Sequence, residues 1–354
     1  MTPSVPLSDR LREVVPTSHL QDASLLAELA RRWTERQRFW HGPRHLLAML
    51  EEIIATTTAG DDRDTLLLAA AYHDAIYDPT ASDNEEASAQ LLERQARDAS
   101  SPIITRAAAL IRASAWQTEP TDDLTARFFA LDTRQLADDC PLGERLAYEH
   151  AIFREFQFTP WATYQAKRRE FLESWATRFP EHRTGVAQCL ELLTALQPRV
   201  AIYPGSFNPF HLGHLSILRQ AESAFDKVIV SLGVNRQKAG SVKSLRQRQE
   251  ELQRRLRFHE VAAVPGLITR YIDELPFNVT IVRGIRDGTD LEAELRYARF
   301  LNELRPGTQV IWISCEPHLQ HLSSNSICEL ESIEPHAGTR YIPNTAQIYD
   351  IVPR

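Results

Sequence analysis

The chain has 354 residues, of which 43% are hydrophobic and 25% are charged, and its formal net charge is −7. This length allows two ordinary domains, since a single core seldom grows beyond about 250–300 residues. The negative charge argues against a broad nucleic-acid surface, and no apolar run reaches the ~20 residues that span a bilayer. We therefore expect a cytoplasmic protein that binds small molecules, keeps its four cysteines reduced and binds neither nucleic acid nor membranes.

Residues 1–196 are predicted to form an all-α domain. The segments SLLAELARRWTERQRF, RHLLAMLEEIIATTT and DTLLLAAAYHDAI carry apolar residues at three- and four-residue spacing. This is the period of a helix that buries one face. Few β-branched alternating runs occur in this half of the chain.

Two segments of this domain carry residues suited to metal chemistry. In RFWHGPRHLLAML, His41 and His45 are four residues apart, hence on one helical face if the helix already includes His41. In AAAYHDAIYD, His73 and Asp74 are adjacent at the end of a strongly apolar helix. A buried His–Asp pair is costly without a partner such as a metal ion.

Together with NEEASA (84–89), these segments resemble the HD superfamily of metal-dependent phosphohydrolases, in its small bacterial branch. The sequence departs from that branch at Trp40-His41-Gly42, which stands where the branch has Tyr-His-Asn. The resemblance implies a divalent metal ion, Mn²⁺, Mg²⁺, Fe²⁺, Co²⁺ or Ni²⁺, that activates water and neutralises phosphate charge.

The resemblance also assigns roles to individual residues. It implies metal ligation by His45, His73 and Asp74, and by a later helical aspartate. Asp132 in FFALDTRQLADD is the first choice for that aspartate, and Asp138 and Asp139 are the alternatives. By the same resemblance, His41 protonates the leaving group, and Glu85 and Glu86 support the ligands or activate water.

At Gln197–Pro198 the pattern changes to short β-branched runs, VAIYPGSF, KVIVSLGV, NVTIVRGI and QVIWIS, with amphipathic helices between them. Strands that alternate with helices predict βαβ units and a parallel sheet. We therefore expect residues 199–354 to form an α/β, Rossmann-like domain that binds ligands at the carboxyl ends of its strands.

The first of these strands leads into YPGSFNPFHLGHLSIL, where His211-Leu212-Gly213-His214 begins the next helix. Gly213 lets a polyphosphate approach the backbone, and the helix N-terminus supplies unpaired N–H groups and partial positive charge. Imidazoles at this position can donate hydrogen bonds to phosphates as charge builds in a transition state.

This stretch resembles the HxGH/TxGH nucleotidyltransferase superfamily and, more narrowly, the phosphopantetheine adenylyltransferases. The likeness covers nearly all of residues 199–354. It implies that Ser206 contacts the acceptor phosphate, that His214 is the catalytic histidine and that Lys238 neutralises phosphate charge. VRGIRDGTDLEAEL and HLSSNSICE resemble two further family segments. Across all of these segments, the resemblance implies a substrate and ATP site that also includes Phe207, His211, Gly213, Arg283, Gly284, Arg286, Glu294, Ser323 and Ser324, with Arg283 among the catalytic residues.

The chemistry agrees with this resemblance. The acceptor phosphate is already a nucleophile, so the enzyme has to align two anions and reduce their repulsion. Mg²⁺ is expected to arrive with ATP and to be held mostly by phosphates and water. Arg283 also has a structural interpretation, as an ion-pair partner of Asp290 or Glu292.

Four residues depart from the adenylyltransferase pattern: His211, Asn208, Asn325 and Cys328 replace Thr, Asp, Ser and Lys. They leave the acceptor open between 4′-phosphopantetheine, which we expect, and a nicotinamide or sugar phosphate. Because the end of the chain lacks a cytidylyltransferase-type RTxGxSTS segment, we prefer adenylyl transfer.

The whole chain is thus predicted to be a bifunctional enzyme. The alternative is an N-terminal domain that senses nucleotide or metal without turnover and regulates the transferase. A homo-oligomer is compatible with the resemblance, because phosphopantetheine adenylyltransferases form hexamers. A large N-terminal fusion could block that assembly.

Overall fold

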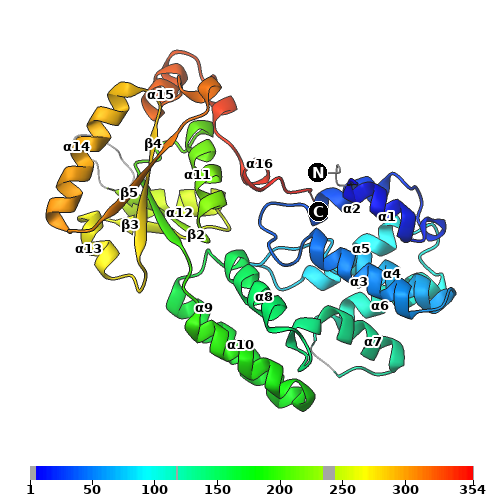
Figure 1. The fold of residues 1–354 in the computed structure, drawn as a ribbon. Helices are drawn as coiled ribbons and strands as arrows, with labels where there is room; N and C mark the ends of the chain where they lie inside the picture. Colours follow the sequence, from blue (N-terminus) through cyan, green and yellow to red (C-terminus); the bar gives the residue numbers. More distant parts are fainter. Residues whose placement is uncertain (1–4, 117–118, 234–243, 354) are drawn as a thin grey trace. The chain divides into compact units, whose positions relative to one another are not determined.

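A computed structural model describes residues 5–116, 119–233 and 244–353 (Figure 1). It confirms a helical N-terminal region and a C-terminal α/β domain with a parallel sheet. Two compact units form, and the chain leaves and re-enters each of them. The N-terminal unit holds Met1–Glu155, Gln165–Thr194 and Tyr349–Arg354, and the C-terminal unit holds Phe156–Tyr164 and Ala195–Ile348.

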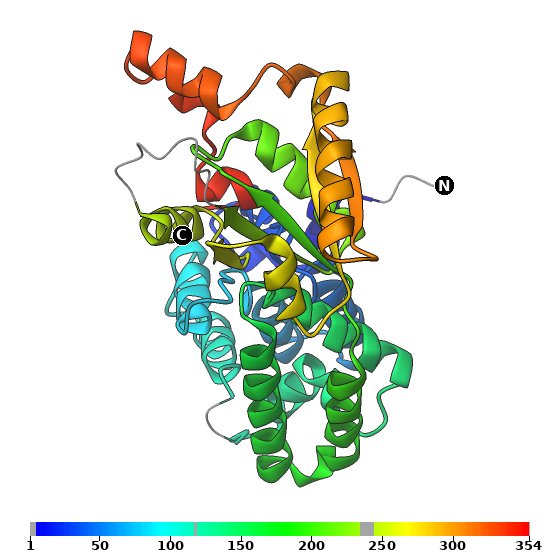
Figure 2. The same ribbon diagram turned by 90° about the vertical axis from the view of Figure 1, so that its left-hand side faces the viewer.

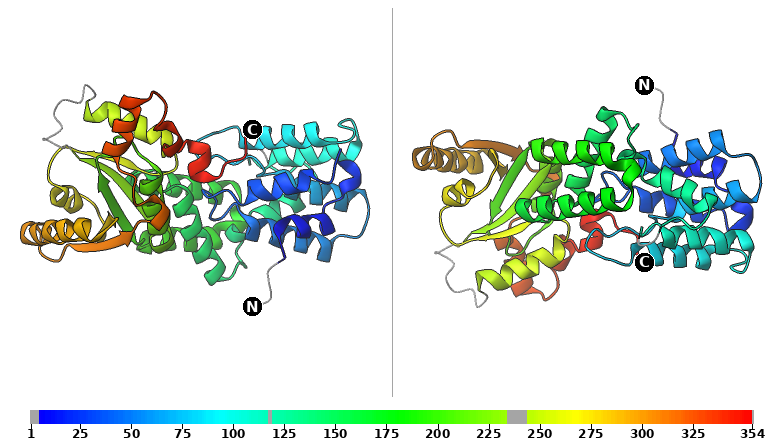
Figure 3. Two further views of the ribbon diagram at one scale, coloured as in Figure 1. Left: turned by 90° about the horizontal axis from the view of Figure 1, so that it is seen from above. Right: turned by 90° about the horizontal axis from the view of Figure 1, so that it is seen from below.

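The helical region contains ten α-helices within the described residues. They are α1 (Leu7–Val14), α2 (Leu25–Trp33), α3 (Pro43–Thr56), α4 (Asp61–Tyr72), α5 (Asn84–Gln95), α6 (Pro102–Ala113), α7 (Asp123–Asp132), α8 (Leu142–Glu155), α9 (Trp161–Arg178) and α10 (Arg183–Ala195). Figures 2 and 3 show α9 and α10 side by side. None of the described helices is both long enough and apolar enough to cross a membrane.

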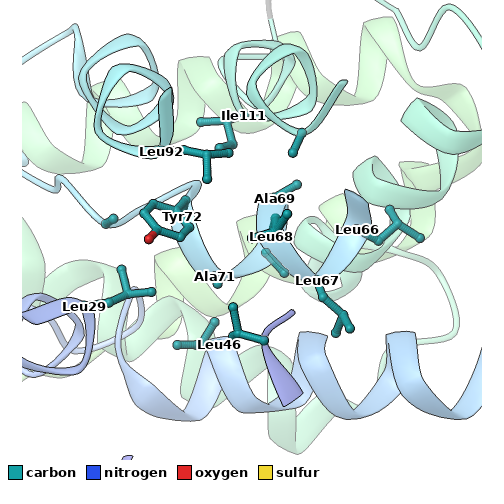
Figure 4. Close-up of a cluster of buried hydrophobic side chains, with 14 of the residues drawn as sticks. Leu29, Leu46, Leu66, Leu67, Leu68, Ala69, Ala71, Tyr72, Leu92 and Ile111 are labelled. Atoms are coloured by element: carbon teal, nitrogen blue, oxygen red, sulfur yellow. The ribbon is translucent and has the colours of Figure 1, made fainter. Parts of the chain in front are cut away.

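Helix α4 is the central element of the N-terminal unit. Three aspartates in its first turn stabilise the helix, because their negative charges lie at the positive end of the helix dipole. From Thr65 to Tyr72 every residue is buried, so this helix is packed on all sides rather than on one face. Figure 4 shows Leu29, Leu46, Leu92 and Ile111 from neighbouring elements around it. The helix therefore ends in the interior, and the residues that follow it are buried.

The C-terminal unit is built on a five-stranded parallel sheet with the order β3-β2-β1-β4-β5. The strands are β1 (Val200–Gly205), β2 (Lys227–Gly233), β3 (Val261–Val264), β4 (Val279–Ile285) and β5 (Gln309–Ser314). The helices are α11 (Leu212–Ala224), α12 (Leu245–Arg255), α13 (Ile268–Asp273), α14 (Gly288–Leu304), α15 (Ser324–Ile333) and α16 (Thr345–Tyr349). In Figure 1, α11 and α12 lie on one face of the sheet, and α13 and α14 on the other.

The strand sequences account for this arrangement. β1 and β2 are nearly continuous buried runs, as expected for central parallel strands that are covered on both faces. Val200 of β1 aligns with Lys227 on one side and with Val279 on the other. The order of connections reverses between β1 and β4, which is the position where sheets of this kind bind ligands.

The end of the chain returns to the N-terminal unit. The Tyr349 carbonyl accepts from the N–H of Arg36 (3.0 Å), and the N–H of Val352 donates to Oε1 of Glu35 (3.0 Å). The guanidinium of Arg32, which is buried, donates to the Pro353 carbonyl at 2.7 Å. The C-terminal segment is thus bound to the end of α2 and to the loop that follows it.

Candidate functional sites

A pocket of about 310 Å³ lies in the C-terminal unit at the carboxyl ends of β1 and β4. Its lining brings together eleven of the predicted transferase residues and one residue that departs from the family pattern. They are Ser206, Phe207, His211, Gly213, His214, Arg283, Gly284, Arg286, Glu294, Ser323, Ser324 and the departing residue Asn325. Lys238 lies outside the described residues. The position matches the ligand crevice expected for a sheet of this order.

His211 and His214 stand at the start of α11 with fixed hydrogen-bond roles. The N–H of Gly213 donates to Nδ1 of His211 (3.1 Å), and the N–H of His211 donates to Nδ1 of His214 (3.2 Å). A backbone N–H can only donate, so each Nδ1 is an acceptor. In the neutral ring, Nε2 therefore carries the proton and is the donor.

The surroundings keep both rings neutral. Burial lowers the pKa of His211 to about 4, helped by the positive charge of Arg286. Burial, His211 and Arg286 together hold the pKa of His214 well below its usual value. Phe207 and Phe210 also pack on His214, with ring centroids 5.0 and 5.6 Å away. The site therefore offers two neutral N–H donors instead of two cations.

Arg283, near the end of β4, is held from three sides. Its Nε and Nη2 donate to the two carboxylate oxygens of Glu294 at 2.6 and 2.5 Å. Its Nη1 donates to the Pro204 carbonyl at 3.0 Å, and its guanidinium lies 5.3 Å from the Tyr297 ring centroid. The sequence proposed Asp290 or Glu292 as ion-pair partners of Arg283, and the partner in the structure is Glu294. Arg283 and Glu294 both line the pocket, so this ion pair fixes the guanidinium at the pocket wall.

Arg286 pairs instead with Asp290, in the first turn of α14, through contacts of 2.7 and 2.9 Å. Its side chain is 40% exposed, which leaves it accessible to a ligand. Between the two arginines, Gly284 permits a close approach of β4 to α11. A Cβ atom built there would come within 2.9 Å of Cγ1 of Ile217.

A second helix also begins at the pocket. Ser323 caps α15, because its Oγ accepts from the N–H of Ser326 at 3.0 Å. Ser324 Oγ donates to the carbonyl of Pro209, in the loop after β1. Two helix N-termini, those of α11 and α15, thus meet the same cavity.

Sequence analysis did not assign several pocket residues to the site. Tyr203, Ile217, Cys315 and Leu322 line the cavity. Aliphatic and thiol groups carry no sequence signal of their own. Position alone could have indicated these residues, because Tyr203 lies two residues before the end of β1 and Cys315 directly follows β5.

The N-terminal unit contains a cluster of possible metal ligands around the end of α4. Ligand atoms of His45, His73 and Asp74 all lie within 4.8 Å of one another. Nε2 of His73 is 3.1 Å from Oδ2 of Asp74 and 3.3 Å from Oδ1 of Asp132. Nε2 of His45 is 3.1 Å from the same Asp132 oxygen. All four residues predicted as ligands therefore converge, from α3, the end of α4 and the end of α7.

The donor set fits a divalent cation. Nδ1 of His73 is 2.9 Å from the carbonyl of Ala70, which can only accept, so Nδ1 carries the proton in the neutral ring. Nε2 therefore faces two carboxylates and needs a positive charge beside it. Burial lowers the pKa of His73, but Asp74 and Asp132 raise it overall, so a proton supplies that charge where a divalent cation would otherwise stand. Although burial alone would raise their pKa values, the histidines hold Asp74 and Asp132 below the usual range.

Of the two glutamates proposed to support the metal ligands, Glu85 lies near the cluster and Glu86 has a partner elsewhere. Burial, then Asp74 and Asp132, raise the pKa of Glu85, which places its carboxyl in the field of the cluster. Glu86 is exposed and pairs with Arg112 at 2.8 Å.

The alternative aspartates serve elsewhere. Asp138 accepts from the N–H of Gly185 at 2.8 Å, and Asp139 pairs with Arg134. Of the three aspartates considered in the sequence, Asp132 is thus the one in the cluster.

His41 lies beside the cluster and not on the same helix as His45. The condition for a shared helical face, that the helix includes His41, is not met, because α3 begins at Pro43 with Gly42 as its N-cap. Proline is favoured at the first position of a helix, where its missing N–H is not needed. The two rings still meet edge to face, with centroids 6.2 Å apart.

The partner of His41 was not identified from the sequence. Oε2 of Glu155, the last residue of α8, is 2.6 Å from Nδ1 of His41 and 2.7 Å from the hydroxyl of Tyr77. Glu155 is 1% exposed. Burial would raise its pKa, but His41, Tyr77 and the His41 backbone together lower it, so the group is a carboxylate. In His41, burial lowers the pKa, and the carboxylates of Glu155 and Asp74 raise it overall.

Comparisons with known proteins relate the C-terminal domain to nucleotidyltransferases. A family model described as cytidylyltransferase-like matches residues 202–329. A phosphopantetheine adenylyltransferase of Clostridium botulinum (strain Hall) is 34% identical over 132 residues, which make up 36% of this chain and 79% of that protein. The protein of the same name from Mycoplasma mycoides subsp. mycoides SC is 36% identical over 135 residues, or 38% of this chain and 96% of that protein.

One solved structure is also similar to this chain. It is the lipopolysaccharide core biosynthesis protein of Thermoplasma volcanium GSS1, with 21% identity and a TM-score of 0.27. The match covers 34% of this chain and 98% of that one.

Proposed function

Because this chain belongs, through its C-terminal domain, to the phosphopantetheine adenylyltransferase family, we propose that it transfers AMP from ATP to 4′-phosphopantetheine. The products would be dephospho-coenzyme A and pyrophosphate. The observation that carries the proposal is the pocket at the β1/β4 switch point, where two neutral histidine donors, two arginines and two helix N-termini meet. These are the groups that an anionic transfer reaction requires.

In the proposed reaction an oxygen of the acceptor phosphate attacks the α-phosphorus of ATP. A new P–O bond forms as the bond between the α- and β-phosphates breaks, and the electron pair leaves with pyrophosphate. Nε2–H of His214 and Nε2–H of His211 donate to phosphate oxygens as negative charge shifts between them. Arg283 and Arg286 reduce the repulsion between the two anions, and Mg²⁺ accompanies ATP as part of the substrate.

The choice of acceptor rests on the relatives and is tested directly. Purified protein with ATP, Mg²⁺ and 4′-phosphopantetheine should release pyrophosphate, and replacing ATP with CTP should reduce release strongly. Nicotinamide mononucleotide and sugar phosphates are the comparison acceptors, since His211 and Asn325 depart from the usual pattern. Release with one of these but not with 4′-phosphopantetheine would transfer the assignment to that acceptor.

For the N-terminal unit the proposal is a metal-dependent phosphohydrolase of the HD type. The observation that supports it is the buried Nε2 of His73, which faces the carboxylates of Asp74 and Asp132. His45, His73, Asp74 and Asp132 would hold the ion, which when bound supplies an activated water and neutralises phosphate charge. Glu85 adds a further carboxyl beside the cluster, and His41 stands at its edge.

A panel of phosphate mono- and diesters with Mn²⁺ tests this second activity. Cleavage of at least one ester, abolished by Asp74→Asn, is the expected result. If no ester is cleaved while the N-terminal region binds a nucleotide tightly, the unit is a sensor that regulates the transferase, which is the alternative drawn from the sequence.

A further inference from the structure

Five hydrogen-bond donors converge on the carboxylate of Glu155. Oε1 accepts from the backbone N–H groups of Phe39, Trp40 and His41 at 2.8, 2.7 and 2.9 Å. Oε2 accepts from Nδ1 of His41 and from the hydroxyl of Tyr77. The side chain of Glu155 is fully buried, so all of these bonds form away from water. We propose that Glu155 is the positioning residue of the N-terminal site, fixing both the backbone turn and the ring of His41. This inference rests on the hydrolase function proposed above.

Only a carboxylate can satisfy this set of donors. An ionised Glu offers two acceptor oxygens and no donor, whereas a Gln of the same shape replaces one oxygen with an NH₂ group. In one orientation that NH₂ group would face three backbone N–H groups, and in the other it would face Nδ1–H and the Tyr77 hydroxyl. Glu155→Gln therefore keeps the volume but confronts donors with donors in either orientation.

The arrangement determines which nitrogen of His41 remains for the site. Because Nδ1 donates to Glu155, Nε2 is the ring nitrogen that is not engaged by this carboxylate. The ring is held further by Tyr77, whose centroid lies 4.5 Å away at an interplanar angle of 31°. Arg38 donates to the His41 carbonyl at 3.1 Å and to the Asp74 carbonyl at 2.7 Å. The turn that carries His41 is thereby tied to the end of α4, where the cluster lies.

The first test reads the His41 ring directly and does not depend on turnover. In full-length protein with ¹⁵N-labelled histidine, long-range ¹H–¹⁵N spectra report which ring nitrogen carries a proton, and His41→Asn assigns the signal. We expect a protonated Nδ1 in the wild type and its loss in Glu155→Gln. A wild-type ring protonated on Nε2 alone, or an unchanged signal in Glu155→Gln, would overturn the proposal.

The second test uses bis(p-nitrophenyl) phosphate with Mn²⁺. Glu155→Gln should lower kcat by about 10²-fold or more, as expected when a proton-transferring group is misplaced, with little change in KM or in Mn²⁺ affinity. Adding Glu155→Gln to His41→Ala should cause no further loss, because both act through one group. Equal, additive losses would indicate a merely structural role and contradict the proposal.

Glu149→Gln is the matched control. Glu149 is also buried on α8, but it pairs with Arg168 at 2.6 Å instead of with the His41 turn. Glu149→Gln should lower the free energy of unfolding, because the ion pair with Arg168 is lost. It should leave the His41 ring signal and kcat unchanged. If the wild type does not cleave the ester, the hydrolase function fails for this probe, and the ring spectra still decide whether Glu155 positions His41.

Discussion

The rings of His211 and His214 stack at the start of α11 with centroids 3.7 Å apart, and each Nδ1 accepts a backbone N–H. Gly213 makes this geometry possible, since a Cβ at that position would lie 3.0 Å from Cε1 of His211. Two neutral donors, at the N-cap and in the first turn of α11, are the central element of the proposed transferase site.

The histidine pair predicts an unusual response to pH. Both pKa values are lowered, so the ring signals of His211 and His214 should not shift between pH 6 and pH 8 in NMR titrations. In the unfolded chain both should titrate near ~6.5. The unfolded state then binds more protons below that pH, so the pair makes stability fall as pH drops from about 6.5 towards about 4. A ring that titrates near its ordinary value in the folded protein would contradict this account.

Removal of one donor should reduce catalysis without removing substrate binding. His214→Ala is expected to lower kcat for pyrophosphate release by about 10²–10³-fold, because a donor aimed at developing charge is lost. His214→Asn retains an N–H donor and should recover part of that loss. His318→Ala, at a histidine that is 73% exposed, is the control and should behave as the wild type. Unchanged release by His214→Ala would count against the assignment of this pocket.

Gly284 should tolerate no side chain. Gly284→Ala places a methyl group 2.9 Å from Ile217, so β4 and α11 must move apart, at a cost of about 1–3 kcal/mol in the free energy of unfolding. Gly266→Ala is the control, because a Cβ there meets nothing within 4 Å. Chemical denaturation measures both. Equal midpoints for the two variants would show that α11 does not pack against β4 as described.

Metal removal should destabilise the N-terminal unit. A cation that binds only the folded unit stabilises it by mass action, so a chelator should lower the unfolding temperature of that unit, and Mn²⁺ should restore it. Metal at 100 times its Kd would contribute about 2.7 kcal/mol. Asp132→Asn should abolish this Mn²⁺ effect and Asp139→Asn should retain it, since Asp139 pairs with Arg134. Equal responses of the two variants would exclude Asp132 as a ligand.

The sequence could predict features whose residues lie close together along the chain, and it could not predict contacts between residues far apart along the chain. The parallel sheet and the HLGH helix start are local patterns, so periodicity and glycine placement sufficed. Asp132 could be preferred over Asp138 and Asp139 only through a resemblance, and the structure is what separates them. Glu155 could not be found, because it meets His41 across 114 residues of chain and has no distinctive neighbours in sequence.

The same limit applies to ion pairs within the transferase pocket. Arg283 lies in β4, and three carboxylates follow it on α14, at Asp290, Glu292 and Glu294. Sequence spacing alone does not show which of these carboxylates pairs with the arginine. The choice follows from the direction in which α14 leaves β4, which is a tertiary property. Glu294 is the carboxylate that reaches the guanidinium, while Asp290 is taken by Arg286.

The bonds that hold the C-terminal segment on Arg32 and Glu35 also constrain the order of events during synthesis. A ribosome delivers the helices of the N-terminal unit long before it delivers Tyr349–Pro353. Until then Glu35 lacks the Val352 N–H, although its other oxygen already pairs with Arg38 at 3.1 Å. The N-terminal unit therefore emerges first but completes its packing last, after the whole transferase domain has been translated.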